Sequence, residues 1–384
     1  MMKSQFLLNP EITFLNHGSF GACPKPIFED YQKWQLELER EPIQFITKTG
    51  LKYLNDSKQA LASYINCDAD DFVYVPNPTT AMNTVIKSLK LKAGDEILST
   101  NQEYGAIKKT WNYYCQKANA EFVEAPISLP LVSKEKFLEE FWSALTPKTT
   151  IVFLSHITSE TALIFPIKEI IEKAKILGLM TIIDGAHAPG HIDLDLKMLD
   201  PDVYTGACHK WMLTPKGNSF LYVKKHLQNQ IEPLIVSWGY ESAFPSHSKF
   251  LDWHQYNGTR DFSAYLTTPK AINWLKENDW KTKTDVCKKQ LLEYYPIVAK
   301  ELDADVICPL TNDFLGQICS IPIQTKEPFL LKELLYNKYK IEIPVVVTPK
   351  QNYLRISFQA YNGLKEIETL IDAIRDIKRS GNLL

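Results

Sequence analysis

LMTIIDGAH (179–187) is a short apolar run, rich in β-branched residues, that ends in a polar turn at Asp184 and Gly185. Runs of this kind are typical of buried strands. Six more lie between residues 71 and 225: DFVYVP (71–76), GDEILST (94–100), AEFVEAPI (120–127), TTIVFLSHI (149–157), VYTGACH (203–209) and NSFLYVKK (218–225). The sequence therefore predicts seven strands in this part of the chain.

Amphipathic segments between several of these runs predict helices. They are TAMNTVIKSLK (80–90), GAIKKTWNYYCQKAN (105–119), KEKFLEEFWSAL (134–145) and PIKEIIEKAKILG (166–178). In the last segment Ile167, Ile170 and Ala174 fall on one helical face, and Gly178 is a typical stop signal. Strands that alternate with helices predict an α/β fold with a mainly parallel sheet. Ligands of such folds bind at the carboxyl ends of the strands.

The pattern changes after residue 266 and predicts a smaller α+β domain. Two longer helical segments are followed by a mixture of strand-like and helical runs: DVICPL (305–310), GQICSIPI (316–323), a helix around PFLLKELLYNKYK (328–340), IEIPVVV (341–347), YLRISF (353–358) and a final helix over 365–378. We therefore expect a large domain over residues 20–265 and a small domain made of residues 1–19 with 266–384.

Composition excludes several classes of protein. A formal net charge of −2 over 384 residues gives no reason to expect nucleic acid or an anionic membrane as a partner. The seven cysteines contain no CxxC pair and no ligand spacing for a metal, so no disulfide framework or metal site is expected. We find neither a signal peptide nor the ~18 apolar residues that a membrane span needs. The sequence therefore predicts a cytoplasmic protein.

Asp184 and Lys210 follow two consecutive predicted strands. On its own, Asp184 is as easily explained as a turn-forming or helix-capping residue. Most lysines are solvated at the surface, but Lys210 stands between His209 and Trp211, in a context that predicts burial. Burial lowers the pKa of a lysine, and only the neutral amine is a nucleophile that forms Schiff bases.

VPNPTTAMNTV (75–85) is a polar turn between a predicted strand and a predicted helix. The hydroxyls of Thr79 and Thr80, with the amides of Thr80 and Ala81, would form a phosphate site at the helix N-terminus. A threonine cap without any ligand is the common alternative. Together, a phosphate anchor, an amine and a carboxylate are the three groups that pyridoxal 5'-phosphate (PLP) requires, the carboxylate keeping its ring nitrogen protonated.

The chain resembles fold type I PLP enzymes of the class V aminotransferase group, and most closely their isopenicillin N epimerase-like branch. The resemblance covers nearly the whole chain, and its most specific part is DGAHAPG with HKW. It is carried by FLNHGSFGACPKPI (14–27), QEYGA (102–106), SHITSETALIFPI (155–167), IIDGAHAPG (182–190), CHKWMLTPKG (208–217), YNGTRDFSAY (256–265) and LRISFQAYN (354–362).

The resemblance implies roles for individual residues. Lys210 would carry the Schiff base, Asp184 would contact the ring nitrogen and His187 would orient the cofactor or its phenolic oxygen. Of the other residues, Tyr104 would stack on the ring, Ser159 (with Thr158) would contact the 3-oxygen region or the substrate, His209 would lie near the phosphate, Thr259 would reach the phosphate of a neighbouring subunit, Arg355 would bind the substrate carboxylate, and Asn16 and His17 would line the substrate side. The active site would thus belong to a homodimer.

Two features depart from the patterns of the superfamily. Pro78 stands where many relatives have a small residue, which leaves the local phosphate geometry open. Cysteine desulfurases carry a nucleophilic cysteine on a mobile loop near the carboxyl terminus, whereas Cys308 and Cys319 lie here in strand-like, apolar runs. Desulfuration through a persulfide on the enzyme is therefore disfavoured.

The resemblance implies an enzyme that acts at Cα of an α-amino acid, or a derivative of one, through an aldimine and a quinonoid. Reprotonation on the opposite face gives epimerisation, reprotonation at C4′ gives transamination, and loss of a side-chain substituent gives carbon–sulfur lysis. All three reactions use the same residues, so the motifs do not separate them. We expect isopenicillin N epimerase-like activity, with a class V aminotransferase or carbon–sulfur lyase as the alternative, and a non-catalytic PLP-fold binding protein as a more distant one.

Overall fold

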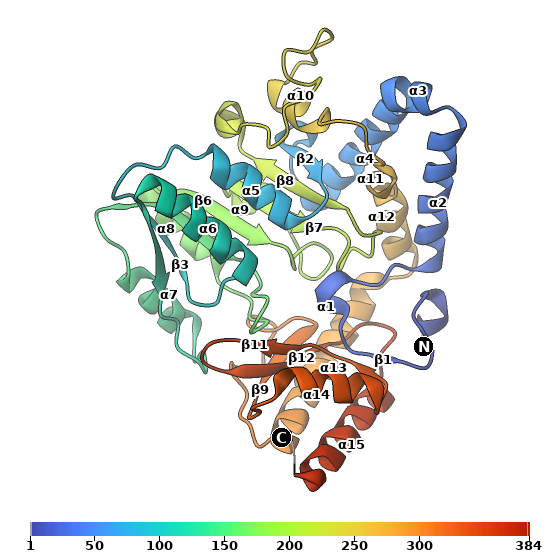
Figure 1. The fold of residues 1–384 in the computed structure, drawn as a ribbon, viewed down its shortest axis with the longest axis vertical. Coiled ribbons are helices and arrows are strands. Elements are labelled where there is room, and N and C mark those ends of the chain that lie inside the picture. The colour runs from blue at the N-terminus through green and yellow to red at the C-terminus, as the bar shows by residue number, and fades with distance from the viewer. Residues whose placement is uncertain (1, 382) are drawn as a thin grey trace.

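The computed structural model describes residues 2–381 and 383–384, and its largest feature is a seven-stranded sheet (Figure 1). The strands are β2 (Phe72–Val75), β3 (Glu96–Thr100), β4 (Glu121–Ala125), β5 (Thr149–Ser155), β6 (Met180–Gly185), β7 (Val203–Ala207) and β8 (Ser219–Val223). They are ordered β2-β8-β7-β6-β5-β3-β4. All neighbours from β7 to β4 are parallel, and β8 is antiparallel to both strands beside it. The predicted α/β fold is confirmed.

A hydrophobic core lies on each face of this sheet, because side chains alternate along a strand. In β2, Val73 points into one core and Tyr74 into the other. The first core includes α5 (Pro78–Ser88) and α6 (Gly105–Ala118), and the second includes α4 (Gly50–Ile65), α7 (Lys134–Ser143) and α8 (Ile167–Ile176). The predicted apolar face of α8 is buried, as expected for a helix that covers a sheet.

Shorter helices and one long helix complete this part of the chain. They are α1 (His17–Phe20), α2 (Lys25–Arg40), α3 (Pro42–Gln44), α9 (Leu196–Leu199), α10 (Lys249–Gln255), α11 (Ser263–Leu266) and α12 (Thr268–Glu277). The long helix, α2, has Pro26 in its first turn, where a missing amide proton costs nothing.

The C-terminal elements form a separate layer below the large sheet in Figure 1. They are α13 (Trp280–Glu301), β9 (Ile318–Ile323), α14 (Pro328–Asn337), β10 (Ile341–Glu342), β11 (Val345–Val347), β12 (Asn352–Ser357) and α15 (Leu364–Ser380). Strands β11, β12 and β9 form an antiparallel sheet in that order.

The N-terminal residues join these C-terminal elements. Strand β1 (Thr13–Phe14) pairs with β10 in parallel, and the amide of Ser357 donates to the carbonyl of Leu15 over 2.9 Å. Helix α1 then continues between the two layers (Figure 1). The grouping of residues 1–19 with 266–384 in one small domain, and its boundary at residue 265, stay predictions.

Two predicted strands near the C-terminus differ from the structure. Residues 305–310 form no strand; the amide of Ile307 donates to the Tyr295 hydroxyl and its carbonyl accepts from Leu131, so the segment is bonded without a partner strand. Residues 341–347 are divided at Pro344 into β10 and β11, which belong to different sheets. A proline cannot donate to a ladder, which explains the break.

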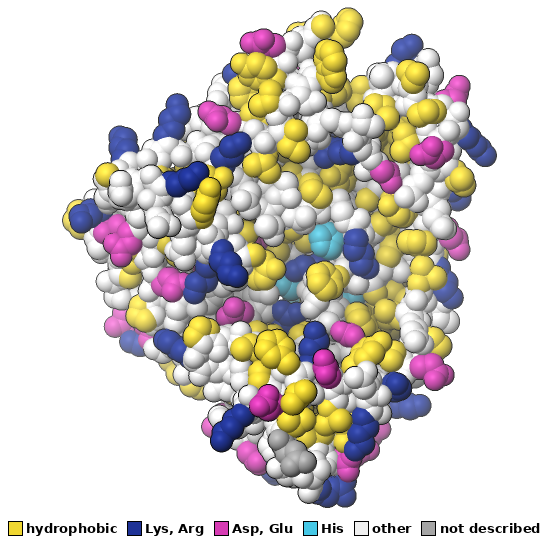
Figure 2. Space-filling model, viewed as in Figure 1, with side chains coloured by type: hydrophobic (Ala, Val, Ile, Leu, Met, Phe, Trp, Pro, Cys, Tyr) yellow, Lys and Arg dark blue, Asp and Glu magenta, His cyan; other side chains and the backbone are white. Residues whose placement is uncertain are grey.

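Histidine and basic side chains gather near the middle of the face shown in Figure 2, in the region where α1 lies between the two layers. Among the described residues, no helix combines the length and the apolar character needed to cross a bilayer.

Candidate active site

Two parallel neighbours, β6 and β7, bring the predicted carboxylate and amine to the same edge of the sheet. Asp184 lies at the end of β6, opposite Thr205 of β7, and Lys210 follows the end of β7 by three residues. Asp184 is buried and Lys210 is partly buried. The predicted pair is therefore placed where α/β folds bind their ligands.

Lys210 is held in an environment that favours its neutral form. The pKa of its amine is lowered to about 7, mainly by loss of water and also by the nearby charge of Arg355, while Asp184 opposes the shift. Its Nζ lies 3.1 Å from Nε2 of His187. Because a neutral amine is a nucleophile and an ammonium is not, this lysine is prepared to attack an aldehyde.

His187 connects Lys210 to the indole of Trp211. The indole Nε1–H donates to Nδ1 of His187 over 3.3 Å. Burial holds the pKa of His187 well below its usual value, so the ring is neutral. The histidine predicted to orient the cofactor thus lies beside the amine.

The Asp184 carboxylate keeps one oxygen available. Its Oδ1 accepts from the amide of Ala186 over 3.0 Å, and Oδ2 has no hydrogen-bond partner among the described residues. Burial raises the pKa of Asp184, while the Ala186 amide and the charge of Lys210 oppose the rise. A carboxylate in this setting gains stability from a cationic N–H partner.

Arg355 of β12 is buried and forms no ion pair with a carboxylate of the described residues. It is 5% exposed, and its side chain donates to the carbonyl of Ser159 (2.5 Å) and to the hydroxyl of Ser19 (2.8 Å). Its Nε–H has no acceptor, and no acidic side chain of the described residues pairs with it. Burial lowers the pKa of this guanidinium to about 10. A buried cation without a counter-ion is costly, so the site is suited to an anionic ligand.

Tyr104 stands at the start of α6 with much of its ring open. The side chain is 44% exposed, and no aromatic ring of the described residues stacks on it. Its hydroxyl lies near enough to Arg355 to influence that residue's pKa. An open aromatic face at this edge of the sheet fits the predicted stacking role.

The start of α5 differs from the predicted phosphate site. The amides of both Thr80 and Ala81 are already bonded to Asn77, through its side chain (2.8 Å) and its carbonyl (3.3 Å) respectively. Asn77 is an ordinary N-cap, followed by Pro78 in the first turn. The Thr80 hydroxyl also donates to Oδ1 of Asn77, over 3.1 Å. The hydroxyl and the amide of Thr79 are the groups of this turn that have no such bond among the described residues.

His17 is placed under Lys210 and not along an open substrate wall. The ring is fully buried; its Nε2 lies 3.1 Å from the carbonyl of Lys210 and its Nδ1 lies 2.8 Å from the Tyr361 hydroxyl. Both ring nitrogens are therefore used, because the carbonyl must accept and the hydroxyl then donates. Asn16 is likewise engaged, through Glu342 and Ser19.

The two other predicted cofactor-binding residues, His209 and Thr259, are placed differently. His209 is buried beside Lys210, and its Nδ1 lies 3.0 Å from the carbonyl of Asn218, which leaves Nε2 without a partner among the described residues. Thr259 lies in an exposed loop, and among the described residues no hydrogen bond joins its side chain to Asp184 or Lys210.

Sequence reasoning assigned no role to Glu103, the residue before Tyr104. Its carboxylate is 1% exposed and accepts from the Thr100 hydroxyl (2.7 Å) and from the Ser155 amide (2.9 Å) and hydroxyl (2.6 Å). Ser155 is the strand neighbour of Asp184. Burial raises the pKa of Glu103 to about 7, and the charge of Asp184 contributes. Its position inside the QEYGA motif was the available signal.

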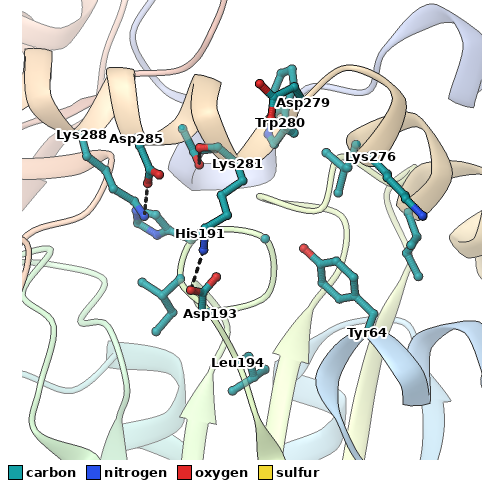
Figure 3. Close-up of a pocket in the computed structure, with 15 residues that line it drawn as sticks. Tyr64, His191, Asp193, Leu194, Lys276, Asp279, Trp280, Lys281, Asp285 and Lys288 are labelled. Atoms are coloured by element: carbon teal, nitrogen blue, oxygen red, sulfur yellow. Dashed lines mark hydrogen bonds and ion pairs between the residues drawn. The ribbon is translucent and has the colours of Figure 1, made fainter.

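A cavity of about 530 Å³ is lined by residues of α4, α12 and α13 and by residues 190–194 (Figure 3). His191 borders it, whereas Asp184, Lys210 and Arg355 do not. Four of the charged side chains at its rim form two ion pairs, Lys281 with Asp193 and Lys288 with Asp285 (Figure 3). The cavity is therefore separate from the candidate active site.

Comparison with known proteins agrees with this geometry. The family model for class V aminotransferases matches residues 26–370, so the chain belongs to this family. The isopenicillin N epimerase of Streptomyces clavuligerus is 31% identical, covering 97% of this chain and 96% of its own. A probable chloroplastic L-cysteine desulfhydrase of Arabidopsis thaliana is 27% identical, covering 97% and 84%.

Solved structures show the same fold at lower identity. The cystine C–S lyase C-DES, in complex with its product cysteine persulfide, gives a TM-score of 0.81 at 20% identity, covering 96% of this chain and 98% of its own. A cysteine desulfurase of Thermococcus onnurineus gives 0.84 at 17% identity, covering 99% and 98%. The chain thus has the fold type I architecture of PLP enzymes, and PLP is its cofactor.

The residues present fit this cofactor. Lys210 offers a neutral amine, Asp184 offers a free carboxylate oxygen and Tyr104 offers an open ring. When bound, PLP accepts the electron pair that is left when a bond at Cα breaks.

Proposed function

We propose that this class V enzyme acts at Cα of an α-amino acid or a derivative of one, with Lys210 as the residue that holds the cofactor and moves the Cα proton. The observation that carries the proposal is a neutral amine grouped with a buried carboxylate and a buried, unpaired guanidinium. The three groups match the three needs of the reaction: a base, a partner for the ring nitrogen and a site for the substrate carboxylate.

Each side chain has a defined task in this proposal. The guanidinium of Arg355 binds the substrate carboxylate, as a planar fork with a free N–H can do. Asp184 keeps the proton on the ring nitrogen through its free oxygen. His187 directs Nε2 at the amine and would orient the phenolic oxygen of the cofactor, while Ser159 lies next to Arg355. Thr79, Thr80 and His209 would hold the phosphate.

Epimerisation is the first candidate for the reaction. The support is the 31% identity with an isopenicillin N epimerase over nearly the full length of both chains. Proton return to the opposite face of Cα needs a donor there, in addition to Lys210, and Tyr104 is already assigned to stacking on the ring.

Carbon–sulfur lysis is the second candidate, because plant L-cysteine desulfhydrases match the chain over a similar length. Such a reaction requires one base and a leaving sulfur, and Lys210 supplies the base. A route through a persulfide on the enzyme is not supported. The seven cysteines are buried, and burial raises the pKa of both Cys308 and Cys319, which suppresses their thiolates.

The deciding experiment is incubation of the purified enzyme with a panel of amino acids and amino-acid derivatives in deuterated water. Deuterium at Cα with inversion identifies an epimerase. Pyruvate, ammonia and sulfide from cysteine identify a lyase, and a keto acid without sulfide identifies an aminotransferase. A Lys210→Ala control should abolish every one of these products. Absence of Cα exchange with all substrates, in an enzyme that has bound PLP, would contradict the proposal.

The proposal includes a homodimer in which Thr259 reaches the phosphate of the neighbouring subunit. Thr259 is exposed, and apolar side chains stand exposed in the preceding loop: Val236 (67%), Trp238 (88%) and Phe244 (91%). Exposed apolar side chains in one segment are typical of protein interfaces. Light scattering at micromolar concentration tests the dimer, and a monomer of 44.1 kDa that retains full activity would contradict it.

A further inference from the structure

Trp211, the residue after the candidate Schiff-base lysine, is completely buried and firmly packed. The ring of His191 stacks on its indole at 4.0 Å with an interplanar angle of 24°. The ring of His17 lies 4.9 Å away on a tilted plane. Gly190 approaches its backbone so closely that a Cβ there would lie 2.5 Å from the carbonyl carbon of Trp211. These contacts hold the indole in a single position.

The indole nitrogen imposes a direction on two hydrogen bonds. An indole N–H only donates, so Nδ1 of His187, at 3.3 Å, must accept and carry no proton. A neutral imidazole has one proton, which must then lie on Nε2. The atom 3.1 Å from Nε2 is Nζ of Lys210, and an N–H that points at it requires an amine with a free electron pair. An ammonium has none.

We propose that Trp211 is a positioning residue that keeps Lys210 uncharged by fixing which ring nitrogen of His187 carries the proton. This inference rests on the proposed role of Lys210 as the amine that holds the cofactor. Without the indole, His187 can adopt the other tautomer, in which Nε2 accepts from an ammonium. Lys210 would then be stabilised in the charged form that cannot attack an aldehyde.

The other charged and titratable groups around Lys210 do not replace this control. Arg355 of β12 and Asp184 of β6 act on Lys210 with opposite signs. His191 accepts from the amide of Gln317 at Nε2, so its Nδ1–H donates to the carbonyl of His187. His209 is bonded to Asn218. None of these residues is bonded to a ring nitrogen of His187.

The test compares wild type with Trp211→Phe in the full-length enzyme after removal of PLP. The measured quantity is the rate at which added PLP becomes covalently bound, followed by absorbance and by borohydride trapping, from pH 5.5 to 9.5. The wild-type rate should rise through an inflection near the Lys210 pKa of about 7. In Trp211→Phe the amine of Lys210 loses the N–H of His187 that donates to it, and its ammonium gains a ring nitrogen that accepts from it. The inflection should therefore move upward by about one pH unit, and attachment at pH 7 should be about fivefold slower.

A matched pair of variants separates the indole's action through His187 from loss of packing. Trp211→Phe in a His187→Phe background should leave the inflection where the His187→Phe single variant has it. The inference fails if Trp211→Phe keeps the wild-type inflection, or if it shifts the inflection equally in both backgrounds. If wild type itself forms no bond to PLP that Lys210→Ala abolishes, the proposed function fails instead.

A measurement on the wild-type chain keeps the inference testable if Trp211→Phe does not fold. Nitrogen-15 NMR of histidine-labelled enzyme distinguishes a protonated from an unprotonated ring nitrogen, and loss of one signal set in His187→Gln identifies His187. We expect the proton on Nε2 with Nδ1 bare. A proton on Nδ1 would overturn the inference.

Discussion

Replacement of Arg355 by methionine should lower the activity of the enzyme and leave its stability almost unchanged. Methionine keeps an unbranched side chain, although a shorter one, and removes the guanidinium. If the substrate carboxylate forms two charge-assisted hydrogen bonds with the guanidinium, their loss weakens binding by about 3 kcal/mol, which lowers kcat/KM roughly 150-fold. The covalent attachment of PLP to Lys210 should remain.

The effect of Arg355→Met on stability follows from its burial. Burial lowers the pKa of the guanidinium from 12.5 to about 10, so the charged form is disfavoured in the folded chain by about 3 kcal/mol. The bonds to Ser159 and Ser19, which are lost as well, are worth a similar total. The two effects offset each other, and we expect the free energy of unfolding to stay within about 1 kcal/mol of wild type.

The assay is steady-state kinetics with the substrate found in the deuterium screen, together with urea unfolding. Arg375→Met is the matched control, because Arg375 is an exposed arginine that already pairs with Glu301. It should change neither quantity by a large amount. A loss of several kcal/mol in Arg355→Met with little change in kcat/KM would refute the reasoning, since Arg355 would then be a structural residue.

Three further predictions follow from the site. Glu103→Gln removes a carboxyl whose raised pKa of about 7 favours the folded state at low pH, so from pH 4 to 8 wild type should lose about 3 kcal/mol of stability relative to the variant, measured by urea unfolding; parallel pH curves would contradict this. Asp184→Asn should leave PLP attached but slow Cα exchange roughly 100-fold, because the amide does not hold the ring proton; unchanged exchange in deuterated water would count against the role. Thr259→Ala should weaken PLP affinity about tenfold as measured by equilibrium dialysis, through loss of a hydrogen bond to a charged phosphate. Mixed dimers of Thr259→Ala and Lys210→Ala subunits should regain a site with high PLP affinity, because Thr259 of one subunit then meets Lys210 of the other. If Thr259 contacted the phosphate of its own subunit, no site in the mixed dimer would contain both residues.

Sequence alone was sufficient for the sheet and for the position of Asp184 and Lys210 at one edge of it. Seven apolar runs alternate with helices, and this periodicity is read directly from the chain. Asp184 and Lys210 follow consecutive parallel strands, and adjacency in the sheet then follows from topology. The isolated Arg355 was identified through the family resemblance, because nothing in YLRISF indicates that the arginine is buried.

Other features depend on contacts that a linear pattern does not contain. His17 was expected to face substrate, but its partners, the carbonyl of Lys210 and the hydroxyl of Tyr361, lie 193 and 344 residues away. The use of the Thr80 amide by Asn77 was local and could have been predicted, since an asparagine followed by Pro78 is an N-cap signal. The segment around Cys308 has apolar residues but lacks a strand partner, which composition does not reveal.

The bond between His17 and Tyr361 also has a consequence for biosynthesis. During translation the residues around His17 leave the ribosome long before their partners, β10, β12 and Tyr361, are made. The hydrogen bond that holds His17 beneath the carbonyl of Lys210 therefore forms only after residue 361 has emerged. A nascent chain stopped before residue 361 would contain Asp184, Lys210 and His17 but would lack the Tyr361 hydroxyl that donates to His17.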